Sequence, residues 1–574
     1  MTGNAARTVM SKPDRRIPLS RNGRAFQRDD HASVGVIFAL SLTPVVLLIG
    51  AVFDYGRALQ ARDTLRQATD SAALALTKVA TSQTSAQLEA LAANMLATAS
   101  TRAPSTLVGA PQISEDKMKV CLDTTTNVDT TFMKIVAIDH VRISANACAT
   151  NASVNFEIAL VLDTSGSMNN SAGSMTKIAA VRSVANSFVN TMYSTYPTPT
   201  GQTTPRVKFS VVPFSDSVAV NDADTGNRSA SWIDVNAQSS WHWKGWSPSG
   251  AASGLATGVT ATSRFTVYSW LKSARASYDW AGCFETPPYP LNVQEFTPSS
   301  ANPDSLFVPM LAPDEPDTMS GGYSNNYLSD NPTASCTGAA PTTEAGKQGR
   351  VCKYKTPSIT ASTSSGNGPN YSCVSKPLQR LTATQLDVTN KISSLTASGA
   401  TNLHEGLMWG WRTIAPSGPF GDGVSYASSS ASVPTRKVLI LMTDGMNTWG
   451  AKSNALNKSD YEGPGYYTSS TTGSSRFPTT DSSGNTLLPI TTSAGGTLAL
   501  DQLTREACAN ARAAGIEVYT VGFESSDAIS AQGKTLLKQC AGDDTHFFLA
   551  TSATGLSDAF SAIGKKLNAL YLSK

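Results

Sequence analysis

Residues 155–168 read NFEIALVLDTSGSM, a run in which an apolar stretch ends in an acid and two hydroxyls at alternate positions. The positions from Ile158 to Leu162 are all apolar, which is typical of a strand buried on both faces of a parallel sheet. Ligands of open α/β sheets bind beyond the carboxyl ends of such strands. The stretch therefore has two interpretations, a metal-binding loop or a polar turn, and the rest of the chain decides between them.

Further apolar runs alternate with helical patterns downstream of this stretch. Strands are expected at residues 207–214, 437–444, 516–523 and 546–550. Helices are expected at 177–192, as two stretches within 384–413, at 500–514, and in a last helix with Leu556, Phe560, Ile563, Leu567 and Leu570 on one face. This alternation predicts an α/β domain over residues 155–570, with a mostly parallel sheet and helices on both faces.

Two stretches interrupt the pattern. Residues 221–380 are rich in Ser, Pro, Gly, Asn and Trp and contain Cys283, Cys336, Cys352 and Cys373. Because the eight cysteines form an even set without a Cys-x-x-Cys pair, we expect this part to be a disulfide-stapled insertion, with three connectivities open. Residues 447–497 form a second insertion, rich in Ser, Thr and Gly, which the composition predicts to be mobile. Cys508 and Cys540 are expected to meet at one end of the sheet.

Three segments of the predicted domain carry oxygen ligands at matching places. Asp163, Ser165 and Ser167 follow the first strand, Asp444 closes the strand at 437–444, and Thr401 lies where a turn meets a helix. If the sheet forms as predicted, these residues supply two carboxylates and three hydroxyls. An all-oxygen set suits a hard cation such as Mg²⁺, which keeps part of its water and needs few charged ligands.

This constellation resembles the metal-ion-dependent adhesion site (MIDAS) of von Willebrand factor A (VWA) domains. The shared pattern is Asp163-x-Ser165-x-Ser167, then Thr401, then Thr443-Asp444-Gly445, in the same chain order. The resemblance implies a Rossmann-like VWA fold that binds Mg²⁺, with Mn²⁺ or Ca²⁺ as alternatives. It also implies a protein partner that presents a carboxylate to the metal. The alternative is a degenerate site that only caps the strand ends.

The N-terminal part has the pattern of a membrane anchor. Residues 1–30 are polar and basic and are expected to be a disordered cytoplasmic tail. Residues 32–53 contain no charged side chain. This run is long enough for a single transmembrane helix, which we place at residues 31–54. The cations that precede it predict a cytoplasmic N-terminus and an exported C-terminal bulk. A cleaved signal peptide is the alternative.

Residues 55–150 are expected to form a helix followed by a small sheet, a pilin-like α+β region that Cys121 and Cys148 would staple. The helix carries a narrow seam with two interpretations, an assembly surface or packing inside its own domain. The seam consists of Ala58, Ala61, Leu65, Ala68, Ala72, Ala75 and Val79.

The N-terminal segment, residues 29–75, resembles the start of TadG-type Flp pilus-assembly proteins, most closely over residues about 25–80. Such proteins combine this segment with a C-terminal VWA domain, which implies a role in Tad secretion and Flp pilus assembly. The resemblance also implies an anchor in the inner membrane, with the bulk of the chain in the periplasm or cell envelope. The related TadE and TadF proteins carry a Glu early in the apolar run, where this chain has Ile37. That departure favours a permanent anchor over prepilin-type processing.

Other functions are weighed against this one. A net charge of +3 with 15% charged residues provides no basic field for nucleic acid, and no catalytic motif is complete, so no enzyme activity is expected. The cluster around Trp241 and Trp243 is interpreted either as a small core or as a contact for glycans. The partner is expected to be a pilus or outer-membrane component. The alternatives are a surface adhesin or matrix-binding VWA protein, and a structural envelope protein that uses no metal.

Overall fold

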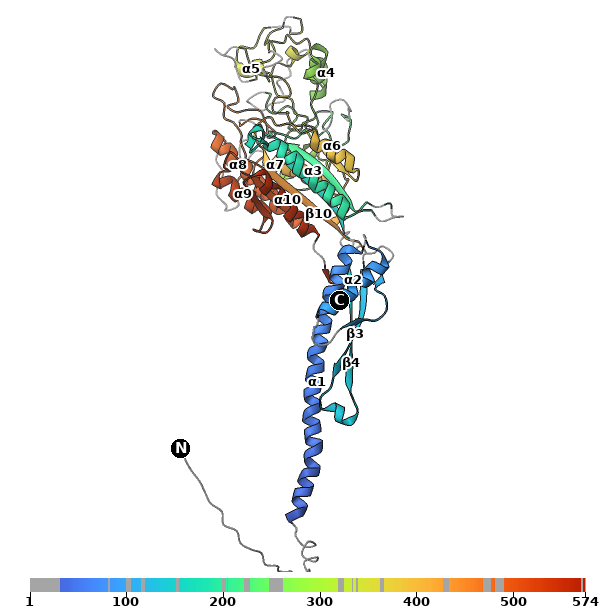
Figure 1. The fold of residues 1–574 in the computed structure, drawn as a ribbon. Coiled ribbons are helices and arrows are strands. Elements are labelled where there is room, and N and C mark those ends of the chain that lie inside the picture. Colours follow the sequence, from blue (N-terminus) through green and yellow to red (C-terminus); the bar gives the residue numbers. More distant parts are fainter. Residues whose placement is uncertain are drawn as a thin grey trace, which may run out of the picture. The chain divides into compact units, whose positions relative to one another are not determined.

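The chain divides into two compact units, residues 1–152 with 570–574 and residues 153–569 (Figure 1). The computed structural model describes residues 31–80, 83–99, 105–114, 119–150, 154–198, 203, 205–220, 228–246, 262–317, 325–332, 334–336, 339–361, 366–426, 433–467, 476–480, 490–568 and 571–572. The predicted cytoplasmic tail, residues 1–30, lies outside them, as does Leu570 of the predicted apolar face.

The first unit is one long helix with a small antiparallel sheet along it. Helix α1 (His31–Val79) is continuous over 49 residues and is followed by α2 (Ser85–Ala99). Strands β3 (Lys119–Asp129) and β4 (His140–Thr150) form a hairpin whose turn holds the short helix η1 (Met133–Val136). Strands β1 (Thr106–Leu107) and β2 (Gln112–Ile113) pair with β3, and β13 (Tyr571–Leu572), from the other end of the chain, pairs with β4.

The small-residue seam of α1 packs inside this unit. Ala58 and Leu65 contact Val128 and Ile143 of the hairpin, and Ala72 lies in a second cluster with strands β3 and β4. Alternate residues of β3 are buried, as a strand with one covered face requires. The structure therefore favours packing over assembly as the role of the seam. Cys121 and Cys148 lie directly opposite each other and form the predicted disulfide.

The second unit is built on a six-stranded sheet with the order β12-β11-β10-β5-β8-β9. Five of these strands are parallel and match the predicted runs: β5 (Asn155–Asp163), β8 (Val207–Phe214), β10 (Thr435–Thr443), β11 (Glu517–Phe523) and β12 (Phe547–Ala550). The sixth, β9 (Gln379–Thr382), is an antiparallel edge strand that the sequence did not indicate. The apolar strands β5 and β10 lie at the centre, buried on both faces.

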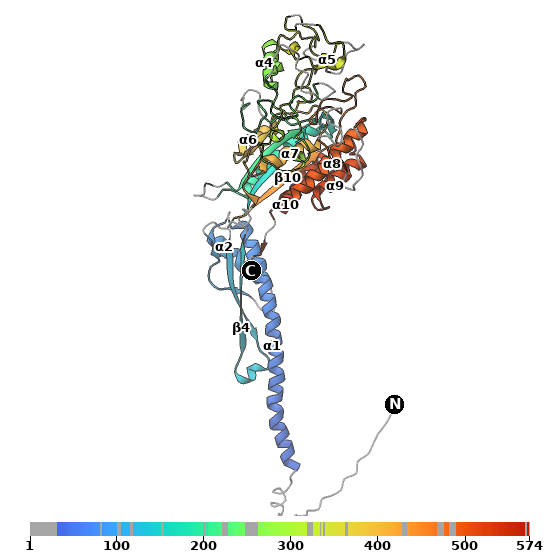
Figure 2. The same ribbon diagram turned by 180° about the vertical axis from the view of Figure 1, so that it is seen from behind.

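Helices cover both faces of this sheet, which confirms the predicted fold class. Contacts link α3 (Lys177–Thr195) to α6 (Gln385–Ser393) and α10 (Ala553–Leu567). A second set links α7 (Leu403–Ile414), α8 (Ser493–Ala513) and α9 (Ala531–Ala541), seen from behind in Figure 2. Of these, α9 was not predicted, because polar residues interrupt its apolar pattern. Two two-residue strands, β6 (Ser171–Ala172) and β7 (Met175–Thr176), pair before α3.

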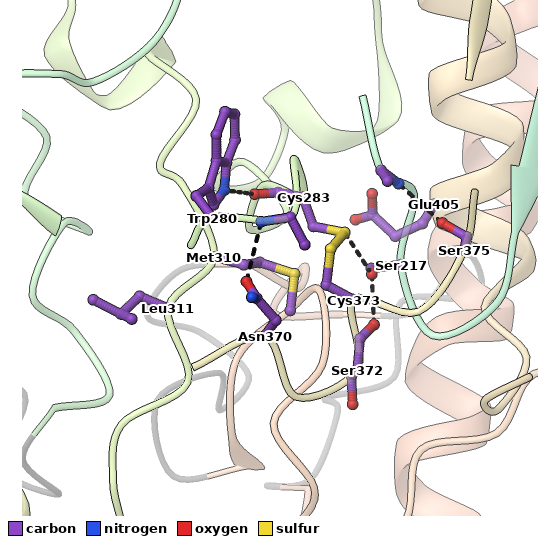
Figure 3. The surroundings of a disulfide bond; sticks show 12 residues. Ser217, Trp280, Cys283, Met310, Leu311, Asn370, Ser372, Cys373, Ser375 and Glu405 are labelled. Atoms are coloured by element: carbon purple, nitrogen blue, oxygen red, sulfur yellow. Dashed lines mark hydrogen bonds between the residues drawn. A yellow bond between two sulfur atoms is a disulfide. The ribbon is translucent and has the colours of Figure 1, made fainter. Parts of the chain in front are cut away.

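Disulfides staple the first insertion, as predicted, and the structure selects the pairs Cys283–Cys373 and Cys336–Cys352. Figure 3 shows that the first of these lies against the segment that follows β8. There the Ser217 hydroxyl donates to the carbonyl of Ser372 at 2.6 Å, and Trp280 Nε1 donates to the carbonyl of Cys283 at 3.0 Å. The predicted pair Cys508–Cys540 is also formed.

The helices of the first insertion are short wherever the structure describes its residues. They are α4 (Arg264–Ala274), η4 (Ala276–Tyr278), η5 (Leu291–Val293), η6 (Pro303–Ser305), α5 (Glu344–Gln348) and η7 (Val351–Tyr354). The described aromatics of the Trp cluster are buried: Trp241 is 4% exposed and Trp243 8%. Burial of these rings favours the core interpretation over glycan contact.

The two insertions, predicted as separate segments, share a buried ionic network. Glu285 of the first insertion accepts from Arg264 at 2.7 Å and from Arg476 of the second insertion at 2.7 Å. The Tyr461 hydroxyl, also from the second insertion, donates to Glu285. Arg476 and Tyr461 thus tie described parts of residues 447–497 to the first insertion, and the mobility of this segment stays a prediction.

Candidate metal centre

The carboxyl ends of two neighbouring central strands bring the predicted acids together. Strand β5 ends at Asp163, and β10 ends at Thr443, one residue before Asp444. Leu162 and Met442 are paired in register, so the two acids follow adjacent positions of the sheet. Asp163 is fully buried and Asp444 is nearly so. Strands β5 and β10 pair although 272 residues separate the end of β5 at Asp163 from the start of β10 at Thr435. This pairing creates the site.

Hydrogen bonds order the two acids and the two serines. Asp163 accepts from the Ser165 amide at 2.7 Å and from the Thr443 hydroxyl at 2.6 Å. The Ser165 and Ser167 hydroxyl oxygens lie 3.1 Å apart, and Ser167 donates to Asp444 Oδ1 at 2.7 Å. Each serine hydroxyl that donates its proton keeps lone pairs for a further ligand. Ser167 is half-buried, which leaves this side of the site in contact with solvent.

The loop that carries Thr401 joins the site through backbone contacts. The Gly166 amide donates to the carbonyl of Gly399 at 2.8 Å, and a Cβ on Gly445 would lie 3.8 Å from the Thr401 hydroxyl. Gly399 has φ of +86°, and a Cβ there would lie 2.1 Å from a carboxylate oxygen of Asp216, so only glycine fits. That carboxylate accepts from the Ala400 amide at 2.9 Å.

Helix α7 begins immediately after this loop because Asn402 caps it. The Asn402 side chain accepts from the Glu405 amide at 3.1 Å, which satisfies one of the free amides of the first turn. Thr401 itself is held by Thr448, whose amide donates to the Thr401 carbonyl at 2.8 Å. The sequence order of turn, Thr and helix is therefore realised by ordinary capping, with the Thr401 hydroxyl beside Gly445.

The site carries more negative than positive charge. Burial, and after it the charge of Asp444, raise the pKa of Asp163 to about 7, although hydrogen bonds from Ser165 and Thr443 oppose the shift. Within the described part of the chain, one cation reaches the site: Lys177, the first residue of α3, lies 2.8 Å from Asp444 Oδ2, and both side chains are fully buried. Lys177 also lies 3.5 Å from the more exposed Asp527.

The donor set fits a hard divalent cation. The ligands are carboxylate and hydroxyl oxygens, without sulfur or imidazole, as Mg²⁺ prefers. A cation between Asp163 and Asp444 would offset both the repulsion between the two carboxylates and the desolvation of Asp163. Among the described residues, no group of three or more His, Cys, Asp or Glu is placed to hold a metal, so a site here depends on the hydroxyls.

The structure thus brings together the five predicted residues, Asp163, Ser165, Ser167, Thr401 and Asp444, on three segments at one edge of the sheet. Sequence reasoning missed Lys177, because a lysine at the start of an amphipathic helix reads as a solvated residue. It also missed Asp216, whose only local signal is its position after a strand, in PFSDS. Lys177 contacts Asp444, and Asp216 accepts from the loop that carries Thr401. Neither contact is visible in the sequence.

One family matches part of the chain. Residues 32–78 match the family described as putative Flp pilus-assembly TadE/G-like. The match covers most of α1 and none of the candidate metal centre. Among the described residues, α1 is the one helix that is long and apolar enough to cross a membrane. Among curated proteins, none matches the chain significantly.

Several solved structures resemble the chain loosely. The pilus adhesin SpaC from Lactobacillus rhamnosus GG is 12% identical, with a TM-score of 0.31 over 81% of this chain and 34% of that chain. The vWF domain of the type V pili tip protein Mfa5 from Porphyromonas gingivalis is 12% identical, with a TM-score of 0.29 over 73% and 96%. The PilB minor pilin from Streptococcus sanguinis is 13% identical, with a TM-score of 0.30 over 81% and 78%. This chain spans about a third of the length of SpaC, and likenesses at these TM-scores carry no argument about its function.

Proposed function

We propose that this chain is a membrane-anchored, non-catalytic accessory protein of a Tad-type secretion and Flp pilus system. The family match of residues 32–78 supports the pilus association, and the charge-free run at residues 32–53 supports the anchor. The proposed location is the inner membrane, with the N-terminus in the cytoplasm and the second unit in the periplasm, because the flanking cations precede the run.

The second unit, on this proposal, binds a protein partner through the candidate metal centre. The observation that carries it is the bonded set Asp163, Ser165, Ser167 and Asp444 at the paired ends of β5 and β10, with Thr401 alongside. These residues would hold Mg²⁺, or Mn²⁺ or Ca²⁺ in its place, and the cation would supply an open coordination position for a carboxylate of the partner. Such a partner is a pilus or outer-membrane component.

The chain's own residues have defined roles in this binding. Thr443 and the Ser165 amide hold Asp163 in one orientation, so the carboxylate is preorganised and loses little freedom when a ligand arrives. Lys177 holds Asp444 from the buried side and leaves the half-buried Ser167 side for the partner.

Crosslinking in intact envelopes tests the proposal. The wild type is compared with Asp163→Ala, with and without a chelator, and with Asp558→Ala, an exposed acid on α10, as the matched control. We expect a crosslinked envelope protein in the wild type and in D558A, and its loss in D163A and after chelation. A crosslink unchanged by D163A and by the chelator would refute metal-dependent binding. Normal pilus numbers in a strain without the gene would refute the role in pilus assembly.

A further inference from the structure

The turn of the β3–β4 hairpin, residues 131–138, lies beside one part of α1 and presents apolar side chains to solvent. Its sequence, TFMKIVAI, contains a single charged residue, Lys134. Ile135 is 70% exposed, Val136 53% and Ile138 41%. A loop tip that carries so many exposed apolar residues is unlike an ordinary solvated turn, which is polar.

The turn is fixed to α1 by a carboxylate. Asp54 accepts from the amides of Thr131 at 2.9 Å, Phe132 at 2.8 Å and Met133 at 2.8 Å. Arg57, one turn further along α1, donates to the Thr131 hydroxyl at 2.9 Å. Because three backbone amides donate hydrogen bonds to this one buried carboxylate, the turn has little freedom to move along the helix.

The apolar contact beside Asp54 is equally close. The Phe132 ring packs edge-on against Phe53, with ring centroids 6.1 Å apart. A Cβ on Gly50 would lie 2.3 Å from the Cβ of Phe132, so the close approach requires glycine at this position. The turn therefore docks on the helix between Gly50 and Arg57.

This docking level coincides with the end of the charge-free run. The run of residues 32–53 would be about 33 Å long as a helix, close to the thickness of about 30 Å of a hydrocarbon core. Asp54 is the first charged residue after this run, so Phe53 and Asp54 mark the boundary of the apolar surface. Both views show the hairpin turn beside α1, with the helix continuing past it toward its N-terminal end (Figures 1 and 2).

We infer that the β3–β4 turn is a second membrane contact, which inserts Ile135, Val136 and Ile138 into the headgroup boundary of the bilayer that α1 crosses. The apolar surface of the turn is continuous with that of α1, where Val52 and Phe53 are also exposed, and one lipid surface covers both. Lys134 has a long stem that lets its ammonium reach the phosphates while its neighbours insert. With two points of contact, the bilayer would hold the first unit at a set angle.

This inference rests on the proposed anchor, and photolabelling separates the two. The full chain is reconstituted in vesicles of phosphatidylethanolamine and phosphatidylglycerol with a diazirine side chain in place of Ile37, Ile135 or Val108. Ile37 reports on the anchor. Val108 is exposed and belongs to the same unit, but it lies beside Asp123 of β3, away from the turn, and is the matched control. All three positions are exposed, so the probes should leave the fold intact.

We expect lipid adducts at Ile37 and at Ile135 in comparable yield, with Val108 at background. Adducts at Ile37 combined with background labelling at Ile135 would overturn the inference and leave the anchor standing. Background labelling at both Ile37 and Ile135 would overturn the anchor and the inference together. Labelling of a protein from Ile135, or equal lipid labelling at Ile135 and Val108, would also overturn the inference, because the turn would then have another occupant or no defined depth.

Discussion

Glu285 in the insertions and Asp163 at the strand ends are both buried carboxylates of the second unit, and their surroundings differ in one respect. Glu285 lies between two guanidinium groups, those of Arg264 and Arg476. Although burial raises its pKa, these two cations outweigh the effect, and the pKa of Glu285 is lowered. The pKa of Asp163 is raised, first by burial and then by the charge of another carboxylate, Asp444.

This difference separates a structural network from a candidate binding site. Glu285 has two guanidinium partners from the chain itself, so this carboxylate needs no cation from solution. The strand ends have two acids and one buried cation, Lys177, and therefore retain a negative charge for which a cation from solution is the natural complement. Substitutions of single charged side chains test this difference.

The largest effect is expected from Glu285→Gln. The substitution leaves two buried guanidinium groups without an anion, which costs about 3–5 kcal/mol of the free energy of unfolding. Denaturant unfolding of the full chain measures it. The control is Glu517→Gln, which removes a partly exposed pair with Arg436 and should cost at most about 1 kcal/mol. Equal losses in the two variants would mean that the network contributes no more than a surface pair.

A divalent cation should stabilise the wild type and leave Asp163→Asn unchanged. Binding to the folded state alone adds about 2.7 kcal/mol when the free cation is at 100 times its Kd. The measurement is the unfolding midpoint during a titration with Mg²⁺ or Mn²⁺. E285Q, although less stable, should gain the same increment as the wild type. In a chelator, D163N should be at least as stable as the wild type, because a neutral side chain relieves the repulsion from Asp444. A Mg²⁺ increment retained in D163N would contradict the assignment of this site.

The first insertion holds a second carboxylate, Glu315, which lacks the two arginine partners of Glu285. We expect the stability of the fold to depend on pH through this group. Burial, with the nearby Asp314 and Asp460, raises the pKa of Glu315 to about 7 from 4.5. The folded state then binds the proton more tightly than the unfolded state. The contribution of Glu315 to stability is therefore full below pH 4.5 and is lost as pH rises through about 7, by at most about 1.4 kcal/mol per pH unit. Unfolding midpoints of the wild type and Glu315→Gln between pH 4.5 and 8 should converge at the acid end. A constant difference between the two unfolding midpoints across this pH range would refute the raised pKa of Glu315.

The smallest effect is expected from Lys177→Met. Removing the ammonium beside Asp444 leaves the site more negative, so Mn²⁺ should bind more tightly, by up to about tenfold, which corresponds to about 1.4 kcal/mol. A Mn²⁺ titration followed by electron paramagnetic resonance measures the Kd directly. Lys208→Met is the control, since Lys208 pairs with Glu157, near the opposite end of β5. Unchanged or weaker binding in K177M would mean that Lys177 positions Asp444 rather than competing for its charge.

Part of the fold and of the candidate site could be predicted from local patterns. The parallel strands were recognisable because fully apolar runs of strand length end in polar turns, and the candidate metal centre was predicted from the chemistry of Asp163, Ser165 and Ser167 at such an end. The edge strand β9 and helix α9 escaped prediction because neither has a periodic apolar face strong enough to stand out. The contact between the two insertions was not predicted, because composition does not register Arg476 and Tyr461, whose partners lie in the other insertion.

The sequence alone indicates the α/β class, the long apolar N-terminal helix, two of the disulfides and the five candidate metal ligands, because each inference rests on a local pattern or on the residue types at the ends of predicted elements. The contacts of the folded chain were needed to show that Cys283 pairs with Cys373, that Lys177 lies beside Asp444 and that Asp54 holds the hairpin turn at the end of the apolar run. These contacts join residues far apart through loops without periodicity, so their energies depend on the path of the chain in space. The same path places the acids of β5 and β10 side by side.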